Sequence, residues 1–325
     1  MTKTDKPLVS IIVCCYNREH LLSKTMESVF AQNYSPVEII VLDDGSTDGT
    51  SDLMKGYGNR IRYYRQDNQG IAVTRTNACL LARGEYIAFQ DDDDIMPPDR
   101  ITILYHAIFQ YPDAVFAVGD WLMMDEDGNL TENRYLPENS SKATTPVLLK
   151  NGYEAVLWPK VPAAPHTTLF RKDCGEKINW FDTQYKYASE DKDFFARLCR
   201  LGPIVYVPRI VSYYRRGHSS MTNRKIVTDC HSITFFLNHL NSIHEKDSRL
   251  YKRLQFRILS QLKRIALYRS NGFALPDSVP SDFLTNSLAS LTLMDRIHYW
   301  LYRTLTIRIK KIIKNKRDCF HNDIY

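Results

Sequence analysis

Four consecutive aspartates, Asp91 to Asp94, follow the apolar run "YIAFQ" at residues 86–90. Like charges repel one another, so a folded protein keeps such a group where a cation offsets the repulsion. The neighbouring candidate ligands are all oxygens, with no His or Cys beside them, which favours a hard divalent ion, Mg²⁺ or Mn²⁺. Such an ion is usually held by one or two carboxylates and by substrate phosphates. The aspartates therefore predict a metal–diphosphate site.

Asp94 has an alternative role at the start of the next helix. Pro97 and Pro98 follow it closely, and proline favours the first turn of a helix. Asp94 is therefore predicted to cap a helix that begins near these prolines. The other three aspartates are not needed as caps, so a ligand or a metal explains them better.

The segments around the aspartates alternate between strand patterns and helix patterns. This alternation predicts a mixed, mainly parallel α/β sheet flanked by helices. Ligands of such sheets bind beyond the carboxyl ends of the strands. Asp43 and Asp44, as well as Tyr16 and Asn17, also follow strand patterns and belong to the same edge as the aspartate run. The strands are predicted at 9–16, at 37–50 (a strand that ends in a polar turn), at 61–66 and at 86–90, and the helices at 18–32 and 70–84.

A second acidic group opens the stretch "SEDKDFFARLCRLG" at residues 189–202. Its apolar residues recur three and four positions apart, which predicts a helix. The helix dipole favours acids in the first turn, so Glu190 and Asp191 have a purely structural explanation when this stretch is considered alone.

Composition sets the class of protein. With 325 residues, 44% hydrophobic and 25% charged, the chain is predicted to be globular, with one large domain or two smaller ones. Seven irregularly spaced cysteines lack the two-residue spacing of zinc and redox motifs, which indicates reduced thiols. The N-terminal residues lack the pattern of a signal peptide, and no stretch is an uninterrupted membrane span. We therefore expect a cytoplasmic protein.

Four segments together resemble family-2 glycosyltransferases of the GT-A fold, in the manner of bacterial polysaccharide and lipopolysaccharide sugar transferases. Their order and spacing over roughly residues 8–220 carry the resemblance. It implies a GT-A catalytic domain at 1–222 and an inverting transferase that moves a sugar from a nucleotide-diphosphate donor to a hydroxyl of a glycan or lipid-linked acceptor. The segments are "VSIIVCCYNREHLLSKTMESVFAQNY", "VEIIVLDDGSTDGT", "ARGEYIAFQDDDD" and "YASEDKDFFARLCRLG".

The resemblance implies a nucleotide site at the strand ends. Tyr16, Asn17 and the backbone around Cys14 would border the nucleotide base, and Asp44 would hydrogen-bond to the base. Arg75 matches an arginine that faces the nucleotide in the family. The surrounding "TRTNACLL" departs from the usual "ARNxG", however, so a surface position on a helix explains Arg75 equally well.

The resemblance also implies the catalytic groups. Asp91, Asp92 and Asp93 would form the D-x-D element, with Asp93 as the ligand of a divalent Mn²⁺ or Mg²⁺ ion. Asp91 would be a second metal ligand, and Asp91 and Asp92 would lie near the ribose and the donor sugar. Asp191 matches the usual general base, and Glu190 is the fallback. The base would take the acceptor's proton while the metal neutralises the leaving diphosphate.

Some residues are weaker candidates for contacts with the donor and acceptor. Arg215, Arg216 and His218 are predicted to follow a strand, where the family often has a loop that closes over the diphosphate. A solvated basic turn explains them equally well. Trp180 either stacks on an acceptor sugar or packs in the core, and His166 is expected to be structural.

The pattern changes after about residue 223, where helical spacing replaces strand patterns and predicts a helical extension at 223–325. The tail at 296–317 has eight basic residues, no acid and an apolar stripe. It is predicted to be a helix that lies on an anionic membrane surface, at the inner face of the cell membrane. A helix docked on the catalytic domain remains the alternative. No recognised nucleic-acid-binding fold is present, so no nucleic acid partner is predicted.

Two other functions fit an acidic α/β sheet. A nucleotidyltransferase would carry a phosphate loop rich in glycine and basic residues near its N-terminus, where this chain has "CCYNREH". A non-catalytic carbohydrate-binding module would not need both acidic motifs. Intact acidic motifs therefore favour the transferase over the binding module.

Overall fold

The structure is a computed structural model that describes residues 6–134, 145–185, 188–216, 225–243, 249–270, 296 and 299–300. The chain divides into two compact units. The first comprises the residues up to 186 together with 190–220, and the second comprises 187–189 together with the residues from 221 onward. The predicted domain boundary after residue 222 stays a prediction.

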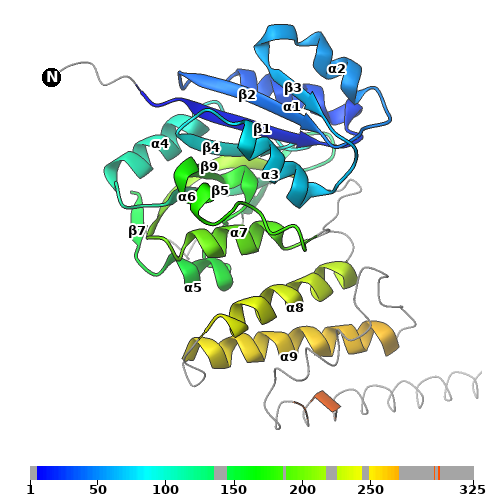
Figure 1. The fold of residues 1–325 in the computed structure, drawn as a ribbon, viewed down its shortest axis with the longest axis vertical. Helices are drawn as coiled ribbons and strands as arrows, with labels where there is room; N and C mark the ends of the chain where they lie inside the picture. Colours follow the sequence, from blue (N-terminus) through cyan, green and yellow to red (C-terminus); the bar gives the residue numbers. More distant parts are fainter. Residues whose placement is uncertain are drawn as a thin grey trace, which may run out of the picture. The chain divides into compact units, whose positions relative to one another are not determined.

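A nine-stranded mixed sheet forms the centre of the first unit (Figure 1). Its strands are β1 (Val9–Cys15), β2 (Val37–Asp43), β3 (Arg62–Arg65), β4 (Tyr86–Asp91), β5 (Phe116–Met124), β6 (Leu130–Arg134), β7 (Val147–Leu149), β8 (Thr168–Arg171) and β9 (Ile204–Arg215). The order is β3-β2-β1-β4-β8-β5-β9-β7, with β6 paired to β5. Neighbours among β3, β2, β1 and β4 are parallel, as are β5 and β9, while β8 is antiparallel to both its neighbours. The predicted mixed, mainly parallel sheet is confirmed.

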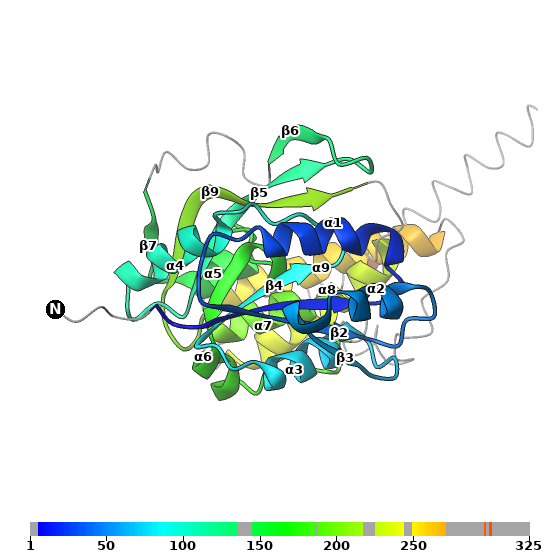
Figure 2. The ribbon, with the colours of Figure 1, turned by 90° about the horizontal axis from the view of Figure 1, so that it is seen from above.

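Helices cover both faces of this sheet. They are α1 (Glu19–Phe30), α2 (Thr50–Gly56), α3 (Ile71–Leu81), α4 (Arg100–Gln110), α5 (Gly152–Leu157), α6 (Lys172–Lys177) and α7 (Glu190–Leu198), with 3₁₀ helices η1 (Gly58–Arg60) and η2 (Pro165–Thr167). Figure 2 shows α1 and α3 on opposite sides of the sheet. The predicted helices at 18–32, 70–84 and 189–202 correspond to α1, α3 and α7.

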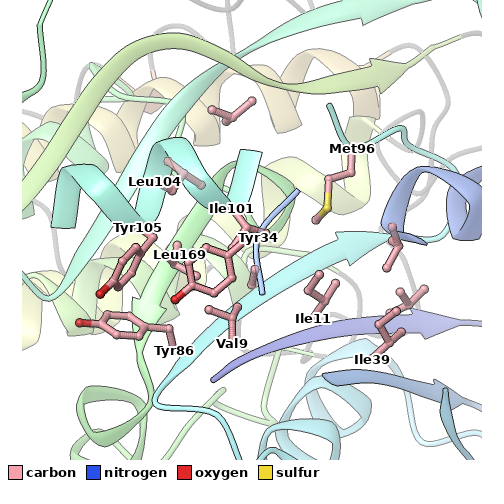
Figure 3. Packing of buried hydrophobic residues seen from close by; sticks show 14 of the residues in the cluster. Val9, Ile11, Tyr34, Ile39, Tyr86, Met96, Ile101, Leu104, Tyr105 and Leu169 are labelled. Atoms are coloured by element: carbon pink, nitrogen blue, oxygen red, sulfur yellow. The ribbon is translucent and has the colours of Figure 1, made fainter. Parts of the chain in front are cut away.

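One face of the sheet carries a hydrophobic core of mainly aliphatic residues together with several tyrosines (Figure 3). Val9 and Ile11 of β1 point to this face and share a buried cluster with Leu22 of α1 and with Ile101 and Leu104 of α4. Every residue of β1 is buried, because a parallel strand covered by helices on both faces has no solvent-facing side. The continuous apolar run of this strand is thereby explained.

The other face carries an aromatic core. Phe89 of β4 stacks on Phe170 of β8, with ring centres 5.9 Å apart, and Phe170 meets Phe194 of α7 edge-on at 5.2 Å. Phe181 stacks on Phe194 at 4.1 Å. Aromatic pairs of this kind add about 0.5–1.5 kcal/mol each beyond their buried area. They hold α7 next to the end of β4, where the aspartate run begins.

The second unit contains two helices that pack against each other, α8 (Lys225–Asn241) and α9 (Arg249–Ser270). These helices confirm the predicted helical character of the C-terminal third. The tail predicted at 296–317 lies almost wholly outside the described residues, which include only Arg296, Tyr299 and Trp300 of it. Among the described helices, none has the length and apolar character needed to cross a membrane.

Candidate functional site

The carboxyl ends of β1, β2 and β4 meet at one edge of the sheet, as predicted. In the strand register, Cys14 lies beside Asp91 of β4, and Cys15 lies beside Asp43 of β2. Cys14 and Cys15 are buried, and burial raises the pKa of the Cys14 thiol to about 12, so this thiol stays protonated. Only the backbone of this segment is therefore available to a ligand.

The turn after β1 exposes an aromatic ring. Asn17 takes a left-handed conformation with φ of 53°, which asparagine tolerates better than most residues. Its N–H donates to Ser46 Oγ at 2.9 Å, and its Oδ1 accepts from the N–H of Thr47 at 2.7 Å. These bonds fix the turn, and the Tyr16 side chain remains 45% exposed, open to a flat ligand group such as a base.

Asp44 organises the loop that leads into α3. One carboxylate oxygen accepts from Gln66 Nε2 at 2.8 Å and from the N–H of Gln69 at 2.9 Å, and the other accepts from the N–H of Gly70 at 2.9 Å. Gly70 has φ of 85°, a conformation that glycine adopts without strain. Asp44 would accept a hydrogen bond from a base in addition to these three.

Arg18 is a site residue that the sequence analysis missed. Its Nε donates to Asp92 at 3.3 Å, and its Nη2 lies 3.8 Å from a carboxylate oxygen of Asp93. Burial and the charge of Asp93 raise the pKa of Asp92 to about 7, and Arg18 opposes that rise. The position of Arg18 directly after Tyr16 and Asn17 was the available signal.

The prediction that Asp94 caps a helix is wrong. Helix α4 begins later, at Arg100, and its N-cap is Asp99, whose side chain makes no capping bond. Asp94 is instead completely buried, and its Oδ1 accepts from the N–H of Arg215 at 2.8 Å. Burial and the neighbouring charge of Asp93 raise the pKa of Asp94 well above its ordinary value.

The donor atoms of Asp91, Asp94 and His166 lie within 4.8 Å of one another and could hold a metal ion. Asp94 Oδ2 is buried and has no hydrogen bond, and His166 Nδ1 lies 3.5 Å from it. Burial lowers the pKa of His166 to about 4, so its ring is neutral and available as a ligand. His166 also forms a 2.8 Å hydrogen bond with Ser212, consistent with the expected structural role. This donor set fits a divalent cation, and the ligand role of Asp93 stays a prediction.

Arg75 joins the two acidic motifs. Its guanidinium donates to Asp91 at 3.0 Å and to Glu190 at 2.7 Å, and the residue is only 7% exposed. The alternative of a surface helix arginine is therefore wrong. Burial lowers the pKa of Arg75, but the charges of Asp91 and Glu190 together raise it by more than burial lowers it. The pKa is therefore higher than usual, and the guanidinium stays charged. A buried cation thus links the end of β4 to the start of α7.

Glu190 and Asp191 have different environments although they are adjacent. Glu190 is buried, and burial together with the charge of Asp191 raises its pKa to about 7, with Arg75 opposing. Asp191 is half-buried, and its Oδ1 accepts from the N–H of Lys192 at 2.7 Å. Asp191 is therefore the more accessible of the two carboxylates.

Arg215 is the last residue of β9, so the prediction that it follows a strand is wrong by one residue. It is 3% exposed, and its guanidinium donates to the backbone carbonyls of Asp93 at 2.8 Å and Glu126 at 2.7 Å. Contact with a diphosphate would require these bonds to be exchanged. Arg216 is exposed, and His218 lies outside the described residues.

Arg100 supports the end of β4 from inside the protein, and the sequence patterns did not mark it as a site residue. It is completely buried in α4 and donates to the carbonyls of Phe89, Pro165 and Thr168 and to Gln90 Oε1. Burial lowers its pKa to about 9. It ties η2 to the end of β4. In the sequence it looks like an ordinary helix arginine, so no signal marked it.

Trp180 packs in the core, which answers the question that the sequence left open. It is 4% exposed, and its ring lies directly over Gly175, where an added Cβ would come within 2.2 Å of it. Its carbonyl accepts from Arg197 of α7 at 2.7 Å. The ring therefore helps to seat α7 and is not open to an acceptor sugar.

Comparison with known families identifies the catalytic unit. The model of the family described as "Glycosyl transferase family 2" matches residues 10–174, just over half of the chain. Glycosyltransferase GlyG of Streptococcus pneumoniae is 37% identical over 127 residues, which are 38% of this chain and 42% of that protein. The chain spans less than half of the length of the first curated relatives that it matches.

Solved structures share the fold. Staphylococcus aureus TarS, in complex with UDP-GlcNAc, matches with a TM-score of 0.64 and 18% identity, covering 93% of this chain and 91% of that one. The mannosyltransferase PcManGT from Pyrobaculum calidifontis, in complex with GDP-Man and Mn²⁺, matches with a TM-score of 0.56 and 15% identity, covering 95% and 88%. These likenesses confirm the predicted GT-A fold.

Proposed function

The chain belongs to glycosyl transferase family 2, and from that premise we propose that it is an inverting transferase that moves a sugar from a nucleotide-diphosphate donor to a hydroxyl of a glycan or lipid-linked acceptor. Family membership makes the chain a transferase enzyme and removes the nucleotidyltransferase and the binding module as alternatives. One observation carries the finer proposal: Arg75 bridges Asp91 and Glu190 and so places the aspartate run beside Asp191.

The donor's diphosphate is proposed to bind at the end of β4 together with a divalent cation. Asp91 and Asp93 would hold the ion, and Asp94 and His166, whose donor atoms lie close to that of Asp91, could contribute further. When bound, the ion would supply positive charge to the leaving diphosphate. Asp94 and His166 are almost fully buried, so the more exposed Asp91 and Asp93 are better placed to share an ion with a substrate. The Mn²⁺ and GDP-Man of the PcManGT structure support this proposal.

The nucleotide is proposed to lie against the turn after β1. The exposed ring of Tyr16 can stack on the base, and the backbone near Cys14 and Asn17 can hydrogen-bond to it. Asp44 holds the loop of residues 66–70 that would close the other side. The UDP-GlcNAc bound to TarS, which shares this fold, supports a nucleotide-sugar donor.

Asp191 is proposed as the general base. It takes the proton from the acceptor hydroxyl while that oxygen bonds to the anomeric carbon and the bond from this carbon to the diphosphate oxygen breaks. The N–H of Lys192 holds one carboxylate oxygen and leaves the other for the proton. Glu190 accepts a hydrogen bond from Arg75, so we assign it the role of positioning α7 and not that of accepting the proton.

Turnover tests this assignment. We would measure release of nucleoside diphosphate from UDP-GlcNAc, UDP-glucose and GDP-mannose with Mn²⁺, for wild type and Asp191→Asn. General-base catalysis contributes about 10²–10⁴-fold in rate, so the variant should lose turnover by that factor and still bind the donor. Asp173→Asn is the matched control, because Asp173 is likewise the second residue of a short helix, α6. Full turnover in Asp191→Asn would overturn the assignment.

The chain is further proposed to act in polysaccharide biosynthesis at the inner face of the cell membrane. The support is the acid-free basic composition of residues 296–317, which suits an anionic surface. Cell fractionation before and after a high-salt wash tests it. Release of a membrane-bound pool by salt is expected, and absence of any membrane-bound pool would contradict the proposal.

A further inference from the structure

Helix α9 has two faces of different character. Its 22 residues include seven basic residues and no acid. One face is apolar and buried, with Leu254, Ile258, Leu262 and Ile265 at 3% exposure or less. Arg249, Lys252, Arg253 and Phe256 are spaced three and four positions apart and so share another face, which we call the basic–aromatic face.

The basic–aromatic face presents a large aromatic ring to solvent. Phe256 is 67% exposed, and Arg249 and Lys252 are also exposed. The four side chains line one shallow pocket on the helix surface. Cations therefore surround an apolar ring on this side of the helix.

Charge repulsion and exposure make this arrangement unfavourable within the isolated helix. Like charges three or four residues apart on a helix repel one another, and an exposed phenylalanine gains nothing from water. Acidic residues would keep the face equally soluble and would pair with the basic ones, yet α9 has none. Another basic residue of the same helix, Arg264, has an acidic partner and makes two hydrogen bonds to Asp229 of α8, at 3.0 and 2.9 Å.

We propose that the basic–aromatic face of α9 docks on an anionic lipid bilayer. Its ammonium and guanidinium groups would meet lipid phosphates, and Phe256 would enter the boundary between headgroups and acyl chains. An acidic protein or a nucleic acid would match the charges, but the protruding ring among them fits the apolar layer beneath lipid phosphates best. The inference uses neither the tail at 296–317 nor the proposed transferase activity.

Vesicle flotation of the full chain tests whether the basic side chains of this face bind anionic lipid. Wild type should float with vesicles containing phosphatidylglycerol and not with pure phosphatidylcholine. Each basic residue near an anionic surface contributes about fivefold in affinity, so Arg249→Glu with Lys252→Glu should weaken binding by at least ~20-fold. Lys24→Glu with Lys150→Glu is the matched control, because it reverses two exposed charges of the first unit and changes the net charge equally.

The contribution of the Phe256 ring is tested by a second variant and its matched control. Phe256→Ser should weaken flotation, whereas Phe109→Ser should not, although Phe109 in α4 is exposed to nearly the same extent, 66%. Both rings are exposed, so neither substitution disturbs a core, and equal melting temperatures would verify this.

A positional probe separates this face from every other basic surface. In Phe256→Trp, brominated phosphatidylglycerol should quench the fluorescence added to that of the four native tryptophans, and in Phe109→Trp it should not. The proposal is overturned if Phe256→Trp is not quenched, if the charge-reversal and serine variants float like wild type, or if wild type fails to discriminate anionic from neutral vesicles.

Discussion

At the scale of single residues, the site is organised around a buried cation. Arg75 pairs with Asp91 and Glu190, which come from the two acidic motifs of the sequence. Because Glu190 is buried in this bridge, the adjacent and more accessible Asp191 is the carboxylate that we propose as the general base. Residue type alone does not separate these neighbours; their different burial does.

Removing the charge of Arg75 should destabilise the protein. Above about pH 7, where Glu190 is ionised, Arg75→Met leaves this buried carboxylate without its cation, and breaking a buried ion pair costs about 3–5 kcal/mol. Urea denaturation measures this loss. Adding Glu190→Gln to Arg75→Met removes the stranded charge and should recover part of the stability. A double variant no more stable than Arg75→Met would show that the pair is not the cause.

The raised pKa of Glu190 predicts a pH dependence. Its folded-state pKa of about 7 exceeds its ordinary value of 4.5, so the folded protein holds this proton more tightly than the unfolded chain. The resulting stabilisation is complete below about pH 4.5 and is lost as the pH rises through about 7. As the pH rises from about 4.5 to about 7, the melting temperature of Glu190→Gln should therefore increase relative to that of wild type. If the difference in melting temperature between the variant and wild type did not change with pH, the raised pKa of Glu190 would be contradicted.

Residue types predicted part of the site. Runs of carboxylates after strands marked Asp44 and the aspartate run, because few folding roles explain several adjacent acids. Arg18 and Arg100 carry no such mark, since an arginine near a helix start is usually an ordinary surface residue. Their roles come from partners far away in the sequence, such as Thr168, which is 68 residues from Arg100.

At the scale of elements, the aromatic core determines the position of Asp191, the proposed general base. Phe194 is fully buried in α7 and contacts Phe170 of β8 and Phe181, so the helix start is held against the sheet. Hydrophobic periodicity predicted the helix but not the strand β8. It could not predict that these rings stack, because stacking depends on how β8 enters the sheet between β4 and β5.

Truncating this core should separate donor binding from catalysis. Phe194→Ala should cost about 3–5 kcal/mol of stability and loosen α7, so turnover should fall while nucleotide affinity stays close to that of wild type. Denaturation, turnover and nucleotide titration measure the three quantities. Phe109→Ala, which alters an exposed ring, is the control and should change none of them. Equal losses of affinity and turnover in Phe194→Ala would contradict the separation.

The wrong prediction that Asp94 caps a helix shows a limit of predicting elements from local sequence. Local sequence made a cap plausible, because two prolines follow within four residues. The carboxylate instead bonds to the backbone of Arg215, 121 residues away. A short polar side chain takes whichever donor the tertiary structure brings to it, and only the assembled sheet fixes that donor.

At the scale of the whole molecule, sequence predicted the family and the fold. The strand and helix patterns predicted that the ends of β1, β2 and β4 share one edge of the sheet, and the structure has this arrangement. The structure adds that α7 is linked to this edge through Arg75. The antiparallel insertion of β8 beside β4 was not predicted, since nothing in a four-residue strand specifies its neighbours. That strand follows directly on η2, which carries His166 next to the aspartates.

We propose that the aspartate run and a divalent cation together bind the donor's diphosphate. The most direct test is calorimetric titration of UDP, GDP and dTDP with Mn²⁺ and then with EDTA, on wild type, Asp93→Ala and Asp94→Asn. We predict that one nucleotide binds only with metal and that Asp93→Ala abolishes this binding. If Asp94→Asn alone abolishes it, the ion lies on the buried set of Asp91, Asp94 and His166. Nucleotide binding that is indifferent to EDTA and to both substitutions would contradict the claim.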